Sequence, residues 1–544
     1  MCATAAQAQI QREVDVTRAY EPSVENALKL NITPDMTDTV QLRPDFRYEI
    51  TPRPLVYGFP VDPISPARFA AVGEAVRYPF YAKLGIGGPM QSVADLRYAK
   101  QLTQRLNVGA YATHQGQYSK IKNDMDIKES ASGTDNRAGA FLDYRAAKDL
   151  VIGGELDYRF RNVHRYGYYA PGSMPSFFDT SKDNLLQFYH DVQLRFSAGN
   201  SFTDRDKVNF RVGAGIDYFA ERYKYDQFVW NVDALVGFRA GYDGFLTIGG
   251  DINMTSGSNN MDDRSGMIGK AGVAYHYDNG DFRVKLGAEI GYSETKNGDG
   301  KENRTLFLPQ IRVEKDLLDG GLTPFADLRS EVTDNSFGEL MKRNPYTFSG
   351  VWAPNTVSYQ VRAGIKGGAG SVKYKVYGGY DMLRDNFYWA NVQEYSAFGN
   401  AFTTLTDSLN VFRAGAEIQA NIRNAVTLNA GVHYANYSSE NYSVAAGLPE
   451  IKADFSATYN HRKRLYVTLG LEMIGERTMF ELDNGVRRNV VPWQADLRFG
   501  LDYFVTPQFG VFFNANNLLN HDIYEFNRYR GLGTNGMVGV KISF

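Results

Sequence analysis

The chain has 544 residues, 59 basic and 61 acidic side chains, and a net charge of −2, which argues against a nucleic-acid-binding protein. Cys2 is the single cysteine, which excludes an intramolecular disulfide and a cysteine-based metal cluster. Aromatic residues reach 14% and glycines number 53, yet no apolar run attains the roughly 18 residues of a membrane helix.

The first nine residues, MCATAAQAQ, are typical of the end of a secretory signal. Ala6, Gln7 and Ala8 fit the small-x-small cleavage pattern, with cleavage after Ala8. The basic and apolar regions that normally precede such a site are not in this sequence. We therefore interpret residues 1–9 as the remnant of a signal peptide, with a lipoprotein cysteine at Cys2 as the competing interpretation.

Residues 10–78 are rich in proline and differ from everything that follows. Proline recurs at positions 22, 34, 44, 52, 54, 60, 63 and 66. Such a segment is extended and cannot build a core of its own. We expect it either to remain in the periplasm or to run into the lumen of the domain that follows.

From residue 79 to residue 544, apolar and polar residues alternate almost everywhere. In DFRVKLGAEIGY, residues 281–292, Phe282, Val284 and Leu286 fall on one face and Arg283 and Lys285 on the other. A period of two predicts strands with one apolar and one polar face. The class is therefore all-β.

A soluble sandwich and a membrane barrel would both explain such strands. The connections favour the barrel, because tight turns such as 241–244 and 277–280 alternate with long loops near 162–183 and 333–355. Short periplasmic turns and long extracellular loops are typical of an antiparallel transmembrane outer-membrane β-barrel. Its lumen would be wide, because the diameter grows with strand number.

About 22 strands, within two, are predicted for this barrel. The expected starts lie near residues 79, 91, 104, 136, 149, 184, 207, 226, 244, 264, 280, 303, 321, 356, 371, 406, 426, 449, 464, 490, 507 and 534. Pro309 and Pro324 fall inside two of these strands, where proline removes a ladder donor. The first pair of strands and the region 303–332 are therefore the least well defined.

The C-terminal stretch GMVGVKISF alternates up to its last residue, so we expect it to close the barrel against the first strand. Phe544 would then lie at the periplasmic boundary, where aromatic residues concentrate. Val540, Ile542 and Phe544 also resemble the C-terminal signal that the barrel-assembly machinery reads. We expect that machinery to be a partner during biogenesis.

The sequence resembles the TonB-dependent receptor superfamily. Three features carry this resemblance: the expected strand number, the terminal Phe544 and the stretch 512–526, FFNANNLLNHDIYEF. Within it, residues 516–520 followed by Tyr524 match a family pattern that precedes the last loop. The resemblance implies uptake of a solute across the outer membrane. Family members carry a plug of well over 100 residues before the barrel, and 10–78 is too short for one. We therefore expect a plugless, receptor-like member.

A TonB box is an acidic-led stretch that pairs with TonB as a strand. Residues 13–17 of this chain resemble one, with the residues Glu13, Val14, Asp15, Val16 and Thr17. Any short β-prone segment would match equally well. TonB and an accessory periplasmic protein or lipoprotein are thus expected as alternative partners, beside outer-membrane lipid and lipopolysaccharide.

Charged residues alternate with the apolar ones and are predicted to face the lumen. Those singled out are Arg211, Asp217, Asp233, Arg239, Arg283, Lys285, Glu289, Arg362, Lys373, Lys375, Asp496 and Arg498. They would either line the pore and select its solute, or simply stabilise the water-facing side of the barrel through cross-strand ion pairs. Their balanced signs favour the second interpretation, since an ion-selective pore should show an excess of one sign.

No catalytic or metal motif stands out. The seven histidines form no HxxxH or HExxH pair, and the loop NGDGKE at 297–302 departs from EF-hand spacing. A hydrolase built on a barrel would need a serine or aspartate beside a histidine on neighbouring strands, and spacing alone identifies no such pair. We expect no enzyme activity, no cofactor and no metal.

The sequence therefore predicts an outer-membrane barrel of a Gram-negative bacterium with a role in solute transport. The alternative is a structural or accessory subunit of an outer-membrane assembly or export complex. The balanced charges and the proline-rich arm at 10–78 support this alternative.

Overall fold

The computed structural model describes residues 78–122, 128–167, 185–200, 202, 206–258, 263–297, 300–318, 320–392, 400–423, 425–483 and 485–544. The signal remnant at 1–9, the proline-rich segment up to residue 77 and the TonB-box-like residues Glu13–Thr17 lie outside the described residues. They stay predictions.

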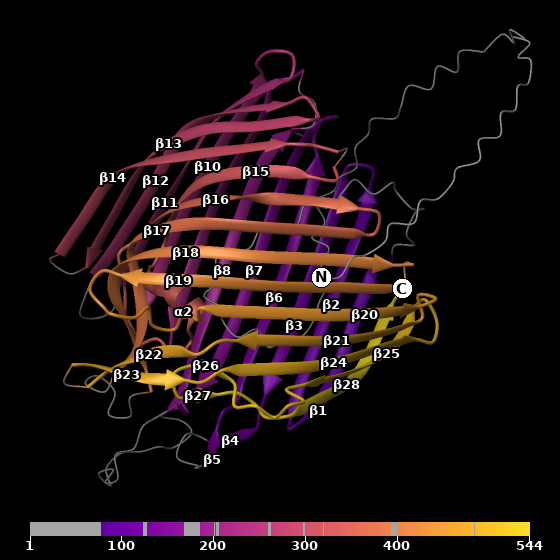
Figure 1. The fold of residues 1–544 in the computed structure, drawn as a ribbon, viewed down its shortest axis with the longest axis vertical. Helices are drawn as coiled ribbons and strands as arrows, with labels where there is room; N and C mark the ends of the chain where they lie inside the picture. The colour runs from indigo at the N-terminus through magenta and orange to yellow at the C-terminus, as the bar shows by residue number, and fades with distance from the viewer. Residues whose placement is uncertain are drawn as a thin grey trace, which may run out of the picture. The chain divides into compact units, whose positions relative to one another are not determined.

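Within the described residues, 22 antiparallel strands form a closed barrel (Figure 1). Each strand pairs with its neighbour in chain order, and the last strand pairs with the first. The barrel strands are β1 (Phe80–Gly88), β2 (Gln91–Thr103), β3 (Leu106–Gln117), β6 (Gly133–Arg145), β7 (Leu150–His164), β8 (Leu186–Asn200), β9 (Asn209–Glu221), β10 (Asp226–Arg239), β11 (Gly244–Ser258), β12 (Asp263–Asp278), β13 (Phe282–Asn297), β14 (Gly300–Lys315), β15 (Thr323–Thr333), β16 (Thr356–Ala369), β17 (Val372–Val392), β18 (Phe402–Ile422), β19 (Val426–Ser439), β20 (Ile451–His461), β21 (Leu465–Ile474), β24 (Gln494–Phe504), β25 (Phe509–Asn516) and β28 (Asn535–Ser543). The predicted all-β class and the strand number are confirmed.

The smaller described elements belong to the connections at the end of the barrel opposite the C-terminus (Figure 1). They are the hairpins β4 (Lys120–Lys122) with β5 (Lys128–Ser130), β22 (Arg477–Leu482) with β23 (Val486–Val491) and β26 (Tyr524–Phe526) with β27 (Tyr529–Arg530), and the helix α2 (Phe337–Arg343). β22 also adds to β17 as a parallel partner, which the sequence analysis did not anticipate.

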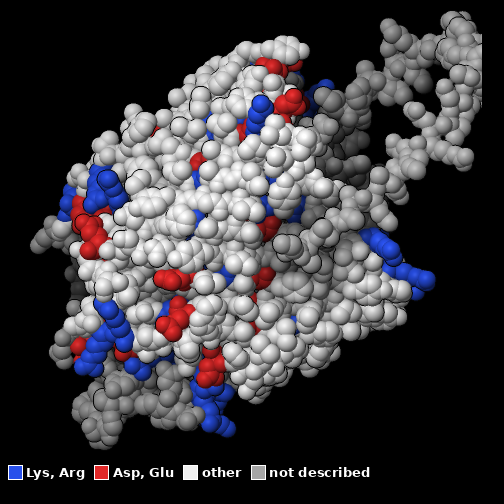
Figure 2. All heavy atoms as spheres, viewed as in Figure 1, with Lys and Arg blue, Asp and Glu red and all other residues white. Residues whose placement is uncertain are grey.

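The wall follows the alternation of the sequence. On β13, Leu286 and Ile290 are 50% and 67% exposed, while Lys285, directly before Leu286, hydrogen-bonds to Gln310 on β14. Alternate residues of a strand lie on opposite faces, so the exposed apolar residues share the outer surface of the barrel. Figure 2 shows one side of the molecule as mostly uncharged, with charged side chains in scattered clusters.

An apolar outer surface on a closed barrel without free strand edges is the architecture of an outer-membrane barrel. The chain is therefore an outer-membrane barrel, as predicted. No helix in the described part of the chain has the length and apolar character needed to cross a bilayer.

Short turns join the strands at the end of the barrel where the C-terminus lies. Gly241 and Gly280 occupy two of them with φ of +93° and +95°, a conformation that side chains with a Cβ rarely adopt. Both lie in turns that the sequence analysis had identified. Closure at this end is completed by β1 and β28, where the Phe80 and Phe544 backbones exchange hydrogen bonds of 2.9 and 3.1 Å.

The backbone hydrogen-bond ladder is short between β14 and β15. It has only four residue pairs there, against sixteen between β13 and β14. Pro309, on β14 just beyond the last of these pairs, has no backbone N–H to donate. Side chains bridge the gap instead: Ser330 Oγ donates to the Pro309 carbonyl at 2.8 Å, and the Tyr359 hydroxyl donates to the Phe307 carbonyl at 3.2 Å. The strands near Pro309 and Pro324 thus exist, but the ladder between them is shortened.

The gap is filled by a small apolar cluster rather than left open. Leu306 and Leu308 of β14 pack against Val332, near the end of β15, and Val357, near the start of β16, and Leu308 is fully buried. This part of the wall is held by side-chain packing where its neighbours are held by backbone hydrogen bonds.

Candidate functional site

Four connections and the ends of β17 and β18 meet in one packed cluster at the end of the barrel opposite the C-terminus, which we call the cap. Its buried core consists of Ile121, Ala131, Tyr166, Leu340, Ala353, Trp389, Phe402, Phe526 and Tyr529. Most of these residues come from the β3–β6, β7–β8, β15–β16 and β25–β28 connections, whereas Trp389 and Phe402 lie at the facing ends of β17 and β18. Segments far apart in the sequence thereby share one hydrophobic core.

The β15–β16 connection, residues 334–355, supplies the centre of the cap through α2. Ser336 has the extended backbone of an N-cap residue, and its N–H donates to Asp334 Oδ1 at 2.8 Å. Glu339 in the first turn and Lys342 in the last turn complement the helix dipole. Its apolar residues Phe337, Leu340 and Met341 are fully buried and decide where the helix docks.

α2 docks on the barrel wall at the ends of β8, β9 and β10. Phe337 packs edge-on against Tyr225, with ring centroids 4.6 Å apart, and against Phe219. Gln227 of β10 fixes the start of the helix, because its Oε1 accepts the Gly338 N–H at 3.0 Å and its Nε2 donates to Ser336 Oγ at 3.1 Å. Helix and wall are thus joined by apolar packing and by buried hydrogen bonds.

The other loops are tied to the β15–β16 connection by aromatic and polar contacts. The rings of Tyr346 and Tyr529 stack with centroids 3.7 Å apart, and the Tyr166 ring lies edge-on to Tyr529 at 5.0 Å. Arg165 Nη2 donates to the Thr347 carbonyl at 2.9 Å, while the Arg165 carbonyl accepts Asn400 Nδ2 at 2.9 Å. The cap is therefore a built structure and not a set of separate loops.

Burial changes the acid–base properties of the cap. Asp334 is half-buried and lies near Glu339, and its desolvation and this neighbouring charge raise the pKa of its carboxyl group to about 6. Burial also raises the pKa of the Tyr166, Tyr346 and Tyr529 hydroxyls, so all three stay neutral. The cap interior therefore contains no phenolate.

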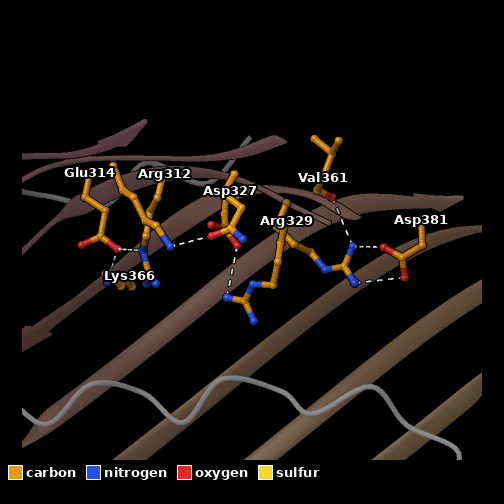
Figure 3. A network of polar contacts seen from close by, with 10 residues as sticks. Arg312, Glu314, Asp327, Arg329, Val361, Lys366 and Asp381 are labelled. Atoms are coloured by element: carbon orange, nitrogen blue, oxygen red, sulfur yellow. Dashed lines mark hydrogen bonds and ion pairs between the residues drawn. The ribbon is translucent and has the colours of Figure 1, made fainter. Parts of the chain in front are cut away.

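Beneath the cap, charged side chains on the face opposite the apolar surface form ion-pair networks (Figure 3). Glu314 lies 2.8 Å from Arg312, 2.9 Å from Lys366 and 3.1 Å from Arg283. Asp381 is fully buried between Arg362 and Arg413, with Arg413 at 2.6 Å. Each network joins residues from neighbouring strands, which is how opposite charges stabilise a sheet.

Most of the charged residues predicted to face the lumen take part in such contacts. Arg211 lies 3.8 Å from Asp233, Arg239 pairs with Asp206, and Arg498 contacts Asp496 at 2.6 Å and Glu472 at 2.8 Å. Lys375 lies over the Tyr377 ring, Asp217 is buried, and Glu289 packs beside Gly272. Lys373 is half-buried on β17, two residues before Lys375.

The residues of the predicted assembly signal lie on the closing strand. Val540 pairs with Leu84 and Ile542 with Ala82, and the Phe544 ring lies 4.7 Å from the Phe80 ring. Their recognition by the assembly machinery stays a prediction. Within the described residues, no group of three or more His, Cys, Asp and Glu side chains is placed to hold a metal ion.

The sequence analysis did not predict the residues of the cap individually. Aromatic residues recur in the stretch 344–354, and from the sequence such a loop could either bind a ligand or fold over the mouth of the barrel. The burial of Trp352 and Ala353 and the stacking of Tyr346 agree with the second interpretation. No local pattern identifies the partner Tyr529, because it comes from another loop.

No family model matches the sequence, and no curated protein matches it. The fold, however, is similar to solved outer-membrane receptors. The FrpB iron transporter from Neisseria meningitidis superposes with a TM-score of 0.69 at 8% identity, over 87% of this chain and 83% of that one. The ferripyoverdine receptor of Pseudomonas aeruginosa gives 0.66 at 12% identity, over 87% and 72% of the chains. The copper transporter OprC gives 0.66 at 12% identity, over 88% and 81%.

These structures are TonB-dependent receptors, so the expected resemblance to that superfamily is confirmed at the level of the fold. They are transport receptors rather than enzymes. At such low identity the similarity establishes the barrel architecture of this chain.

Proposed function

We propose that this chain is a transporter that admits a solute across the outer membrane through the lumen of its barrel when the cap opens. The observation that carries the proposal is the cap itself, a set of loops joined by a shared aromatic core above a charged interior. A barrel that served only as an anchor would not need so many buried contacts between its extracellular loops. The solved transporters of the same fold add support at a coarse level.

The ion-paired interior favours a polar solute over an ion of one sign. Acidic and basic groups alternate across neighbouring strands, as in the Glu314 and Asp381 networks, so neither sign of ion is selected. We further propose that residues 10–78 act as a plug substitute or recruit TonB or another periplasmic partner.

Planar-bilayer conductance tests this function. The intact chain is expected to be closed, and the double variant Tyr346→Ala, Tyr529→Ala to open a conducting state, because it removes the central stack of the cap. Deletion of residues 10–78 reports separately on the N-terminal segment. Tyr242→Ala is the matched control, because Tyr242 is 87% exposed and lies in a turn at the opposite end of the barrel.

The second candidate is the structural or accessory subunit of an assembly or export complex. Its support is the extended arm at 10–78 and the balanced charge of the wall. If the intact chain, the deletion and the cap variant all stay closed, the transport proposal is wrong and this candidate takes its place. Stable stoichiometric partners in a pull-down would then be expected.

A further inference from the structure

A serine, a histidine and an asparagine from three neighbouring strands form a continuous hydrogen-bond relay. Ser92 lies on β2, His114 on β3 and Asn136 on β6. Ser92 Oγ is 2.8 Å from His114 Nε2, and His114 Nδ1 is 2.6 Å from Asn136 Oδ1. The two ring nitrogens of one histidine thus contact a hydroxyl and an amide, which is the arrangement of a nucleophile, a general base and a positioning group.

The surrounding contacts determine the direction of this relay. Asn136 Nδ2 donates to Thr134 Oγ1 at 3.1 Å and approaches the Phe160 carbonyl at 3.5 Å. A carbonyl can only accept, so the amide nitrogen lies on that side and the amide oxygen faces His114. Asn162 supports Thr134 in turn, because its Oδ1 accepts the Thr134 N–H at 3.1 Å and its Nδ2 donates to Thr134 Oγ1 at 2.6 Å.

An amide oxygen at Nδ1 selects one tautomer of His114. The proton must lie on Nδ1, because Asn136 Oδ1 has none to give. Nε2 then carries the lone pair and faces the Ser92 hydroxyl. His114 is therefore oriented and protonated as required to remove the proton of Ser92.

The relay lies on the outer, lipid-facing surface of the barrel. Along β2, Ser92 has the same parity as Leu96 and Tyr98, which are 37% and 40% exposed. The residue paired with Ser92 on β1 is Ile86, which is 71% exposed. The opposite face of β2 carries Asp95 and Arg97, ion-paired at 2.7 Å. None of the three relay residues is buried, so ligands in the membrane can reach them.

The relay also lies near one boundary of the membrane. β1 has nine residues, about the length of a strand that crosses a bilayer at the tilt of a barrel. Ser92 is the second residue of β2, just after the turn at the end of β1 opposite the C-terminus. It therefore lies at the level of the outer leaflet, where lipid ester groups and water meet.

A row of small apolar residues runs from the relay toward the middle of the wall. It consists of small residues on the outer face of β2, β3 and β6, namely Ala94, Ala110, Ala112, Ala138 and Ala140. Leu96 and Tyr98 flank it on one side, and Leu142 lies beyond its lower end. An acyl chain placed along these alanines would hold its ester carbonyl next to Ser92.

We infer that Ser92, His114 and Asn136 form a catalytic triad that hydrolyses an acyl ester of an outer-leaflet lipid. Ser92 is the nucleophile, His114 the general base and acid, and Asn136 the positioning residue. The inference goes beyond the transport function and does not rest on it. It also departs from the expectation of no enzyme activity that the sequence alone supported.

The reaction balances with water as the only co-reactant. Ser92 Oγ bonds to the ester carbonyl carbon while its proton moves to His114 Nε2. The carbon–oxygen bond to the alcohol then breaks, and the alcohol leaves with the proton from His114. Water attacks the acyl-serine, gives one proton to His114 and releases the fatty acid, and that proton returns to Ser92.

Tyr118 is placed to assist the oxyanion that forms in the first step. Its hydroxyl lies 3.5 Å from Ser92 Oγ and 3.4 Å from His114 Nε2. Gly116, across the ladder from Ser92, keeps this space open. A Cβ at that position would come within 2.7 Å of Ser92 Oγ and 2.5 Å of the Tyr118 hydroxyl.

His164 contacts Ser132 Oγ and His276 contacts Thr247 Oγ1, each at 3.2 Å. Two other histidines on the described strands contact tyrosine hydroxyls instead. His190 bonds to the Tyr158 hydroxyl at 2.8 Å, and His461 bonds to the Tyr459 hydroxyl at 3.0 Å. Neither arrangement offers an aliphatic nucleophile. His190 is, like His114, a histidine on the outer face of a barrel strand. A substitution of His190 is therefore a matched control for the substitution of His114.

The test uses the full chain in detergent, with an alkyl fluorophosphonate as the probe, and reconstituted into phosphatidylethanolamine vesicles for fatty-acid release. We expect one adduct, on Ser92 by peptide mass spectrometry, and release that falls at least about 1,000-fold in Ser92→Ala and in His114→Phe. Asn136→Ala should lower the rate and Asn136→Asp should restore most of it, as expected of a positioning residue. His190→Phe should keep the wild-type rate.

Folding of each variant is followed by its heat-modifiable migration in electrophoresis, and none of the substituted residues belongs to the buried core of the cap. Vesicles containing lipopolysaccharide identify which acyl ester is taken, and release from either lipid supports the triad. A folded wild-type barrel that neither forms the Ser92 adduct nor releases fatty acid from either lipid overturns it. So does an equal rate in wild type and Ser92→Ala.

Discussion

The Tyr346 ring stacks on the Tyr529 ring with centroids 3.7 Å apart and an interplanar angle of 25°. One tyrosine belongs to the β15–β16 connection and the other to the β25–β28 connection, so this single contact joins opposite parts of the chain at the centre of the cap. Opening of the cap must separate these two rings. Their stack is therefore the first contact to alter in a test of gating.

Tyr529→Ala is expected to loosen the cap without unfolding the barrel. Tyr529 is 2% exposed, and truncation of a buried aromatic residue costs about 3–5 kcal/mol. Amide hydrogen exchange in residues 334–355 should become faster by the corresponding factor, while exchange in the barrel strands stays unchanged. Tyr242→Ala, at an exposed position, should alter neither, and unchanged protection in Tyr529→Ala would contradict a shared cap core.

The cap is expected to be more stable at pH 5 than at pH 7. The pKa of Asp334 rises from 3.8 to about 6 on burial, so the folded cap binds a proton more tightly than the unfolded one. This contribution is largest below pH 3.8 and is lost as the pH rises through 6; it amounts to at most about 3 kcal/mol. Exchange protection of α2, corrected for intrinsic rates, measures the effect.

Asp334→Asn is the matched variant for this pH dependence. The amide keeps an oxygen to accept the Ser336 N–H, which Asp334 accepts at 2.8 Å, but it does not titrate. Protection of α2 in the variant should be the same at pH 5 and pH 7. A variant that retains the wild-type pH dependence would assign the effect to another group.

Asp381→Asn is expected to destabilise the barrel by about 3–5 kcal/mol. Asp381 is fully buried between Arg362 and Arg413, and its neutralisation removes the buried carboxylate that both guanidinium groups contact. Asp206→Asn removes a solvent-exposed partner of Arg239 and should cost about 1 kcal/mol or less. The temperature at which the folded electrophoretic band disappears compares the two, and equal temperatures would refute the role of the buried network.

Ser330→Ala is expected to weaken the wall between β14 and β15 specifically. The buried Ser330 hydroxyl satisfies the Pro309 carbonyl where the ladder is missing, and an unsatisfied buried acceptor costs about 1–3 kcal/mol. Amides of residues 303–310 should exchange faster in the variant. Tyr359→Phe, which removes a more exposed hydrogen bond, should have a smaller effect, and the reverse order would argue against this bridging role.

Phe544→Ala is expected to lower the yield of barrel inserted in the outer membrane more than it lowers the stability of the inserted barrel. Phe544 is 65% exposed and contacts the Phe80 ring, so its packing contribution is modest. Immunodetection of folded barrel in outer-membrane fractions measures the yield. Equal insertion of wild type and variant would contradict a role for Phe544 in the assembly signal.

The strands of this protein could be located from the sequence with good precision. The expected starts at 226, 244, 356 and 426 coincide with β10, β11, β16 and β19. Alternation is a property of adjacent residues, and in a wall with lipid on one side it must hold for every crossing. The weak strand pairing expected at Pro309 was also predicted from a local feature, the missing N–H of proline. The short β14–β15 ladder agrees with it.

The sequence by itself determined the barrel, its strand number and the positions of its turns, because these depend on period two and on residues such as Gly241. Only the tertiary structure decided which residues meet. The cap joins Tyr346 to Tyr529, and the relay joins Ser92, His114 and Asn136, through a register that no local pattern encodes. Pairing across a sheet depends on how each strand aligns with the next, and that alignment is fixed only when the whole wall closes.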